Sequence, residues 1–273
     1  MRLRFPHGGA VRLAHRAFVA LVYLFVLAPV LFISWLAFFR NEIVSFPPEG
    51  YTLRWFANAW NSRSFFRGFM MSIQVATVSM LVGVTIGTLA SIALARFRFR
   101  GRELLNSLLL SPLIVPGIVA GTALYIFYVE VGELAGLRLT ASVPGLVLAH
   151  ILLTIPWSVR LVSASLAGLD PQIEEAALNL GASRWTAFRR VTLPSTRAGM
   201  IAAALFSFIV SFENLEMSLF LVGPGRTTLP IAILQYLEFN IDPTIAAVSF
   251  VQIVLIGAAM LLSDRFVRLS RVV

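Results

Sequence analysis

Long uncharged apolar runs alternate with short polar segments along almost the whole chain. A transmembrane α-helix needs about 20 predominantly apolar residues, and six stretches approach or exceed that length. They occupy residues 17–39, 68–95, 104–129, 139–159, the segment that starts at 198, and 243–263. This pattern predicts an all-α integral membrane protein with six transmembrane helices.

The longest polar interruption, residues 168–194, has the pattern of two short helices. Asp170 can cap a helix N-terminus, Pro171 suits its first position, and Gly181 suits a left-handed stop. Ser183 can cap a second helix, which we expect Pro194 to end. Apolar residues recur on one face of the first helix at three-, four- and seven-residue spacing: Ile173, Ala176, Ala177 and Leu180. Because two amphipathic helices between spans present an apolar face, we expect a soluble partner protein to dock there.

Composition excludes several classes of protein. The chain is 58% hydrophobic and only 13% charged, whereas about a quarter of the residues in soluble domains are charged. It has no cysteine and only three histidines, so disulfides, thiolate chemistry and histidine or cysteine metal sites are not expected. All 22 basic residues are arginine. A phosphate-binding loop needs a lysine, so any nucleotide that drives this protein must bind to another subunit.

The arginines are distributed by membrane side. If the N-terminus is cytoplasmic, 16 of the 22 arginines lie on that side of the predicted topology. An excess of arginine marks the cytoplasmic side of a membrane protein. The N-terminal arm (1–16), the loop 168–194 and the tail (264–273) are therefore expected to be cytoplasmic, and the six-span transmembrane domain occupies residues 17–263. This distribution also argues against nucleic-acid binding, which needs one basic face.

Prolines and glycines mark special positions within the second and third spans. Pro112 and Pro116 predict a kink or break in the third span. Gly83 and Gly87, four residues apart in the second span, would let another helix approach closely. We expect the segments 130–138 and 223–242 to be loops.

The fifth span contains acidic residues. Only 15 uncharged residues, 198–212, precede Glu213, Asn214 and Glu216. If this span is one helix, the two acids lie three residues apart on one face. Because carboxylates are rare within membranes, they suggest a water-filled path or a cation contact. The alternatives are a position near the outer interface or ion pairs with other spans. For His150, the other ionisable residue in a span, packing among helices is favoured over a proton relay.

The loop resembles a known sequence signature. Residues Glu175-Ala176-Ala177, then Gly181, then 191–194 (VTLP) match the spacing of the "EAA" loop of binding-protein-dependent ABC importer permeases, with Val191 where isoleucine is usual. The segments RFRFRG, SPLIVPGIV and SFENLEMSLFLVGPGRTTLP resemble the second (PotC-like) permease subunit of spermidine/putrescine importers. Asn214 stands where that subgroup commonly has a second acid.

The resemblance implies a type I ABC importer permease fold with a cytoplasmic coupling helix between the fourth and fifth spans. It implies no catalytic residue, cofactor or metal in this chain, with ATP and Mg²⁺ bound by a dimer of ATP-binding cassette subunits. The other implied partners are a second, different permease, a periplasmic binding protein and the lipid of a bacterial inner membrane, with both termini cytoplasmic. It assigns coupling to Glu174, Glu175, Ala176, Ala177, Gly181, Leu193 and Pro194, and a path for a cationic solute, with polyamine favoured, to Glu213, Asn214 and Glu216.

Three alternatives stay open from the sequence. The solute could be another small organic compound or a metal ion. The chain could be a proton-coupled secondary transporter that uses Glu213, Glu216 and His150, although no inverted repeat is visible. It could also be a membrane scaffold that recruits a cytoplasmic protein without transport. An enzyme is disfavoured because no nucleophile–base pair, metal cluster or cofactor motif occurs.

Overall fold

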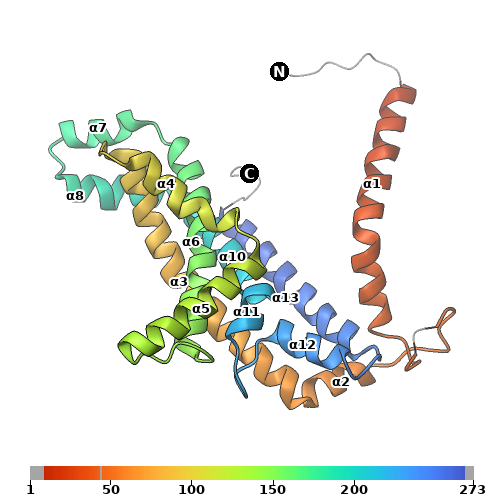
Figure 1. The fold of residues 1–273 in the computed structure, drawn as a ribbon. Helices are drawn as coiled ribbons and strands as arrows, with labels where there is room; N and C mark the ends of the chain where they lie inside the picture. The colour runs from red at the N-terminus through yellow and green to blue at the C-terminus, as the bar shows by residue number, and fades with distance from the viewer. Residues whose placement is uncertain (1–8, 44, 268–273) are drawn as a thin grey trace. The chain divides into compact units, whose positions relative to one another are not determined.

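The structure is a computed structural model that describes residues 9–43 and 45–267, and this part is almost entirely α-helical (Figure 1). Five of its helices are long and apolar enough to cross a membrane: α1 (Gly9–Leu36), α3 (Arg63–Arg96), α5 (Gly117–Ala135), α6 (Val143–Ala167) and α13 (Thr244–Val267). A bent helix pair that ends with α10 (Arg197–Phe212) raises the number of candidate spans to six if it counts as one. The prediction of an all-α membrane protein is confirmed.

The chain forms two compact units. The first comprises Met1–Asn61 and Asn240–Val254, and the second comprises Ser62–Phe239 and Leu255–Val273. Residues 1–8 of the predicted N-terminal arm and 268–273 of the predicted tail lie outside the described residues. Helix α1 begins within the predicted arm, and α13 extends into the predicted tail.

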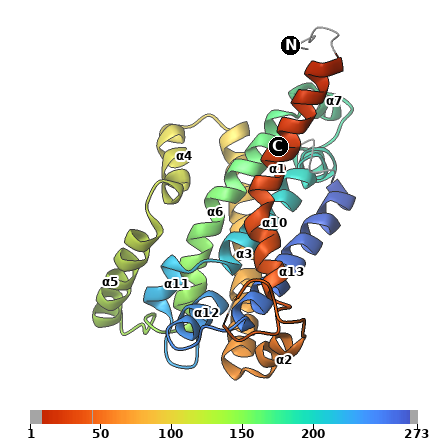
Figure 2. The ribbon, with the colours of Figure 1, turned by 90° about the vertical axis from the view of Figure 1, so that its right-hand side faces the viewer.

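The core of the second unit is built from α3, α6 and α10, which pack side by side (Figures 1 and 2). Gly83 and Gly87 of α3 lie against Thr154 and Ser158 of α6, and a Cβ added at either glycine would come within 2.0 or 2.4 Å of a threonine or serine atom. Small residues at such positions allow two membrane helices to approach closely. The predicted close approach at these glycines is confirmed.

Small hydroxyl side chains join these three helices. Ser79 Oγ donates to the carbonyl of Val147 at 3.2 Å, and Ser91 Oγ donates to the carbonyl of Val159 at 3.1 Å, both from α3 to α6. The hydroxyls of Ser158 on α6 and Ser207 on α10 lie 3.1 Å apart. Hydrogen bonds of this kind between membrane helices contribute on the order of 0.6 kcal/mol each, so they specify the register of the core more than its total stability.

The third predicted span is broken, as its prolines indicated. Helix α4 (Arg102–Leu110) passes into a 3₁₀ turn, η1 (Ser111–Leu113), and α5 starts after Pro116. A proline removes a backbone donor and disturbs the preceding turn, which allows a helix to end and a new one to begin. The predicted loop 130–138 is partly wrong, since α5 continues to Ala135 and stops at Gly136, whose φ is +70°.

The fifth predicted span is also broken, which the sequence reading missed. Helix α10 ends at Phe212, and a separate short helix, α11 (Glu216–Leu221), follows. Glu213 and Glu216 therefore do not share one helix face, so this prediction is wrong. The predicted loop 223–242 is wrong in part as well, because it contains α12 (Leu229–Leu237), whose Leu229 N–H donates to Ser72 Oγ of α3 at 2.9 Å.

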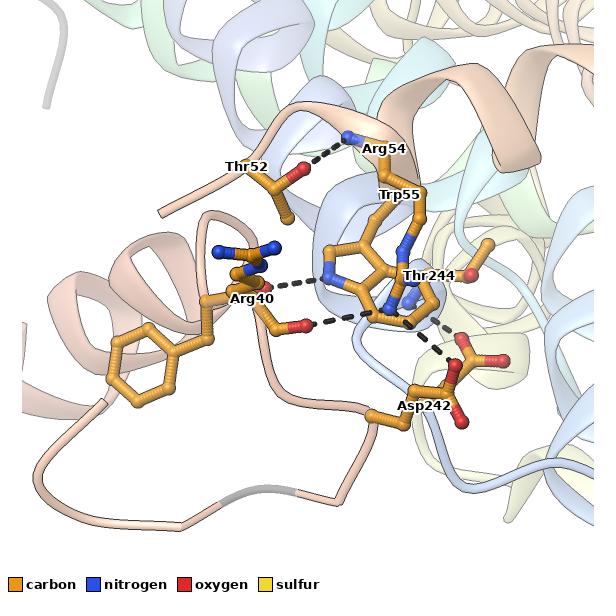
Figure 3. Close-up of polar contacts among 8 residues, drawn as sticks. Arg40, Thr52, Arg54, Trp55, Asp242 and Thr244 are labelled. Carbon is orange, nitrogen blue, oxygen red and sulfur yellow. Dashed lines mark hydrogen bonds and ion pairs between the residues drawn. The ribbon is translucent and has the colours of Figure 1, made fainter. Parts of the chain in front are cut away.

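The first unit contains α1, a short helix α2 (Arg54–Asn61) and the beginning of α13. Its buried Trp55 donates from Nε1 to the carbonyl of Phe39 at 2.6 Å (Figure 3). The rings of Phe38, Phe56 and Phe250 lie 5.2–5.7 Å from one another. These contacts make the segment between the first two spans an ordered structure with its own aromatic core.

Candidate functional site

The loop between α6 and α10 folds as the two short helices that its sequence predicts. Helix α7 (Pro171–Asn179) begins after Asp170, whose carboxylate accepts from the N–H of Gln172 at 2.9 Å. Gly181 has a φ of +87°, a left-handed conformation that costs glycine little. Helix α8 (Arg184–Ala187) begins after Ser183, whose hydroxyl accepts from the N–H of Thr186 at 3.2 Å. The predicted caps and the glycine stop are confirmed.

The second helical stretch of the loop ends at Ser195, one residue beyond the predicted stop at Pro194. After α8 the chain continues as a π-helix, η2 (Phe188–Thr192), and a short helix, α9 (Leu193–Ser195), before α10 begins at Arg197. The helices on the two sides of this junction differ in direction by 58°. Pro194 occupies an early position of α9, where its missing N–H leaves few bonds unmade, and the helical path breaks two residues later at Thr196. Leu193 and Pro194 thus join the loop to a core helix.

The loop presents apolar side chains that no described residue covers. Leu180 is 89% exposed, Trp185 67%, Ile173 50% and Leu178 41%. Trp185 stacks on Phe188 with ring centroids 5.4 Å apart, which holds the exposed indole in place. An exposed apolar surface at an ordered helical loop is typical of a protein-binding site. Of the predicted apolar face, Ala176 is exposed and Ala177 is half-buried.

The two neighbouring acids of α7 have different environments. Glu174 is half-buried: its Oε2 lies 3.1 Å from Nε of Arg96, and its Oε1 accepts from the hydroxyl of Thr192. Glu175 is exposed and makes no hydrogen bond or ion pair with a described residue. The sequence reading gave both acids one role and missed Arg96 and Thr192. The signal available for Arg96 was only its place in a basic turn, RFRFRGRE, which gives no partner.

The break in the fifth span gives Glu213, Asn214 and Glu216 three different surroundings. Asn214 Oδ1 accepts from the N–H of Met217 at 3.0 Å and so caps α11. The Glu216 carboxylate lies against Gly117, the first residue of α5. A negative charge near a helix N-terminus is stabilised by the helix dipole. Glu213 follows the last turn of α10 with its side chain exposed, and its carboxylate has no hydrogen bond or ion pair with a described residue.

His150 bridges the two sides of the same break. It is 1% exposed, its Nδ1 lies 2.8 Å from Ser211 Oγ of α10, and its Nε2 lies 3.1 Å from Ser218 Oγ of α11. The Ser218 hydroxyl donates its proton to the carbonyl of Asn214 at 2.8 Å. His150 and Ser218 thus form a chain of polar contacts that links α6, the break and α11. The prediction that His150 is packed among helices is confirmed.

Among the described residues, no group of three or more histidine, aspartate and glutamate side chains could hold a metal ion. The chemistry that these residues can supply is electrostatic contact and hydrogen bonding. The two candidate regions are the apolar, helical loop at one end of the core and the acidic break in the fifth span.

The chain is similar to known transport proteins. Residues 83–271 match the family described as "Binding-protein-dependent transport system inner membrane component". The chain is 27% identical over 244 residues to the Escherichia coli (strain K12) "Spermidine/putrescine transport system permease protein PotC", an alignment that covers 89% of this chain and 90% of that protein. It is 34% identical over 192 residues to the Haloferax volcanii "Probable molybdenum ABC transporter permease protein", covering 69% of this chain and 70% of the relative.

A solved structure has the same fold. One chain of "a bacterial ABC transporter involved in the import of the acidic polysaccharide alginate" superposes with a TM-score of 0.70, at 12% identity, covering 97% of this chain and 99% of that one. At this identity, the likeness concerns the fold alone.

Proposed function

The chain belongs to the family of binding-protein-dependent transport system inner membrane components, and we propose that it forms half of a translocation path for a small cationic solute, with a polyamine as the first candidate. Membership of the family makes it a multi-pass, non-catalytic permease subunit of an ABC importer, for which no cofactor is needed in the permease chain. The proposal adds the class of solute, the residues that contact it and the partners.

The observation that supports a cationic solute is the environment of Glu213. Asn214 is used as a helix cap, and the Glu216 carboxylate lies close to Gly117 at the N-terminus of α5, where the helix dipole stabilises its charge. Glu213 has no hydrogen bond or ion pair with a described residue and lies at the C-terminal end of α10, where the helix dipole adds a partial negative charge. An acid within a membrane span costs on the order of 2.5–3.5 kcal/mol by insertion scales. A bound cation would offset both costs.

The favoured cation is suggested by a relative. The protein named as a spermidine/putrescine permease aligns over 89% of this chain, and polyamines are small cations that an unpaired carboxylate attracts. A second candidate rests on the relative named for molybdenum, which is 34% identical over a shorter alignment. We therefore keep a permease for another small solute or a metal ion as the alternative. Of the three residues that a proton-coupled transporter would use, Glu213, Glu216 and His150, the histidine has both ring nitrogens within hydrogen-bond distance of serines in the core.

The exposed loop supports the proposed partners. We infer that the apolar side chains of α7 and α8 bind an ATP-binding cassette subunit, because the chain has no lysine and cannot form a phosphate-binding loop of its own. In this assembly two such subunits serve this chain and a second, different permease, and a periplasmic binding protein delivers the solute. The arginine distribution supports cytoplasmic termini and a cytoplasmic loop 168–194 in a bacterial inner membrane. The transmembrane domain is residues 17–263, with an arm at 1–16 and a tail at 264–273.

The experiment is purification of the chain from native membranes with its bound subunits, followed by ATP hydrolysis and uptake assays with spermidine, putrescine and molybdate. We expect a polyamine to stimulate both activities. Glu213→Gln should lower polyamine uptake about tenfold or more while the subunits still co-purify, since a charged hydrogen bond contributes about 1.5–3 kcal/mol. Glu133→Gln, which changes an exposed acid of α5, is the matched control and should have no effect. Stimulation by molybdate alone, or unchanged uptake in Glu213→Gln, would contradict the cationic proposal.

A further inference from the structure

The carboxylate of Glu174 connects three segments that are far apart in the sequence. Its Oε2 lies 3.1 Å from Nε of Arg96, the last residue of α3, and its Oε1 accepts from the hydroxyl of Thr192, the last residue of η2. The side chains of Arg96 and Glu174 are 22% and 20% exposed. One carboxylate therefore ties the loop helix α7 to the end of one core helix and to the segment that leads into another.

Few other contacts attach α7 to the core. Helix α7 packs mainly against α8 and η2, which belong to the same loop, and has no comparable packing on α3. The side chain pair of Glu174 and Arg96 is therefore the principal described connection between α7 and α3. Within η2, the carbonyl of Thr192 accepts from the N–H of Thr196 at 3.1 Å, immediately before α10 begins. A displacement of α7 can thus be transmitted to α3 and to the start of α10 through the contacts of Glu174.

The surroundings make this connection stiff. Arg96 lies at the C-terminus of α3, where a positive charge is stabilised by the helix dipole. Its Nε and Nη2 atoms are buried and donate no well-aligned hydrogen bond to a described residue, so Glu174 is the countercharge that the structure gives this guanidinium. Removing one partner of a desolvated ion pair leaves the other charge uncompensated. The pair is therefore unlike an exposed surface salt bridge, which is weak and easily exchanged.

We propose that Glu174 is a positioning residue that makes α7, α3 and the start of α10 move as one body, while the neighbouring Glu175 faces the partner protein. This inference rests on the proposed function, in which α7 receives the motion of an ATP-binding subunit. It changes the assignment of Glu174 from a contact with that subunit to a link within the permease. The two adjacent acids then have separate tasks: Glu175 binds the partner, and Glu174 passes the displacement to the spans.

The test measures coupling and not activity alone. In proteoliposomes that contain the complete transporter, the ratio of solute transported to ATP hydrolysed is compared for the native chain, Glu174→Gln, Arg96→Gln, and the exchanged pair Arg96→Glu with Glu174→Arg. Glutamine at 174 can still accept from Thr192, so this variant removes only the charge pair. Glu133→Gln, which changes an exposed acid of α5 outside the loop, is the matched control. We expect the ratio to fall about tenfold in either single variant at position 174 or 96, with the ATP-binding subunit still bound, because allosteric coupling is typically 5–150-fold.

The exchanged pair should recover part of the ratio, because it restores the charge pair although an arginine at 174 cannot accept from Thr192. Glu133→Gln should leave the ratio unchanged. A native ratio in Glu174→Gln or in Arg96→Gln would overturn the inference. If the native chain does not retain an ATP-binding subunit, the proposed function itself fails. Retention of that subunit with unaltered coupling in Glu174→Gln refutes only the role given to Glu174.

A second measurement covers variants that assemble poorly. The chain has no cysteine, so spin labels at Gln172→Cys on α7 and Phe97→Cys beside the end of α3 report the separation of the two segments without background. We expect one narrow distance in the purified chain, and a broad distribution when Glu174→Gln is added. An equally narrow distribution in that variant would refute a stiff connection.

Discussion

The close packing of α3 on α6 at Gly83 leads to a prediction that can be worked out from distances. In Gly83→Ala, the new Cβ would lie 2.0 Å from Oγ1 and 2.8 Å from Cβ of Thr154, whereas an ordinary contact is 3.4 Å or more. The obstructing atom is not the end of a flexible chain. Thr154 Oγ1 donates to the carbonyl of Ser79 at 3.1 Å, so turning this side chain away gives up a hydrogen bond between the two helices.

The magnitude follows from three contributions. Adding a methyl group to a well-packed core costs about 1–3 kcal/mol, and the lost interhelical hydrogen bond costs about 0.6 kcal/mol. Against these, alanine is favoured over glycine within a helix by about 1 kcal/mol. We therefore expect a net loss of roughly 0.6–2.6 kcal/mol in the free energy of unfolding.

Gly257→Ala on α13 is the matched control, because a Cβ there meets nothing within 4 Å among the described residues. It keeps the gain in helix propensity and lacks the clash, so it should be neutral or stabilising. The assay is equilibrium unfolding of the purified chain in mixed detergent micelles, with the free energies of the two variants compared directly. Equal stability of Gly83→Ala and Gly257→Ala would refute the packing of α3 on α6 described above.

Two further substitutions test the break in the fifth span and the turn of the loop. His150→Leu should lower the free energy of unfolding by about 1–3 kcal/mol, because it leaves the buried Ser211 hydroxyl without its partner. Thermal unfolding measures this loss, and a His150→Leu chain that is no less stable than Ser211→Ala would contradict the bridging role of the histidine. Gly181→Ala places a side chain at a φ of +87° in open space, so its cost is in the backbone alone, about 1–2 kcal/mol. Asparagine tolerates this conformation better than alanine. The rate of proteolytic cleavage within the loop should therefore be highest with alanine at position 181, lower with asparagine and lowest with the native glycine. Equal cleavage rates in the three chains would exclude a strained turn.

Local signals were sufficient for much of this architecture. Asp170, Gly181 and Ser183 predicted the two helices of the loop, since caps and left-handed stops depend on nearest neighbours in the chain. Pro112 and Pro116 predicted the break in the third span for the same reason. The glycine pair of α3 predicted a close approach but could not name α6 as the neighbour, because helix pairing is a property of the folded structure.

The features that the sequence reading missed depend on distant contacts or on short segments. The pair of Arg96 and Glu174 joins residues 78 positions apart, and no periodicity within either segment indicates the other. The break after Phe212 could have been suspected from Glu213-Asn214, yet a single helix with two exposed acids fits the same residues. Helix α12 is only nine residues long. Its start is marked only by Thr228 at the N-cap and Pro230 in the first turn, and this signal is too short to distinguish from a turn.

The two broken spans meet at their breaks, which gives the missed break a physical explanation. Gly117, the first residue of α5, lies against Glu216, the first residue of α11, and one turn later Gly121 lies against Phe220 and Met217. Non-helical backbone at membrane depth is tolerated only where protein covers it or where it lines a water-filled cavity. Each interruption would be costly if it faced lipid alone, and the contact between the two breaks lets protein cover both. Discontinuous helices commonly build solute sites, so we expect the path to lie beside these two breaks.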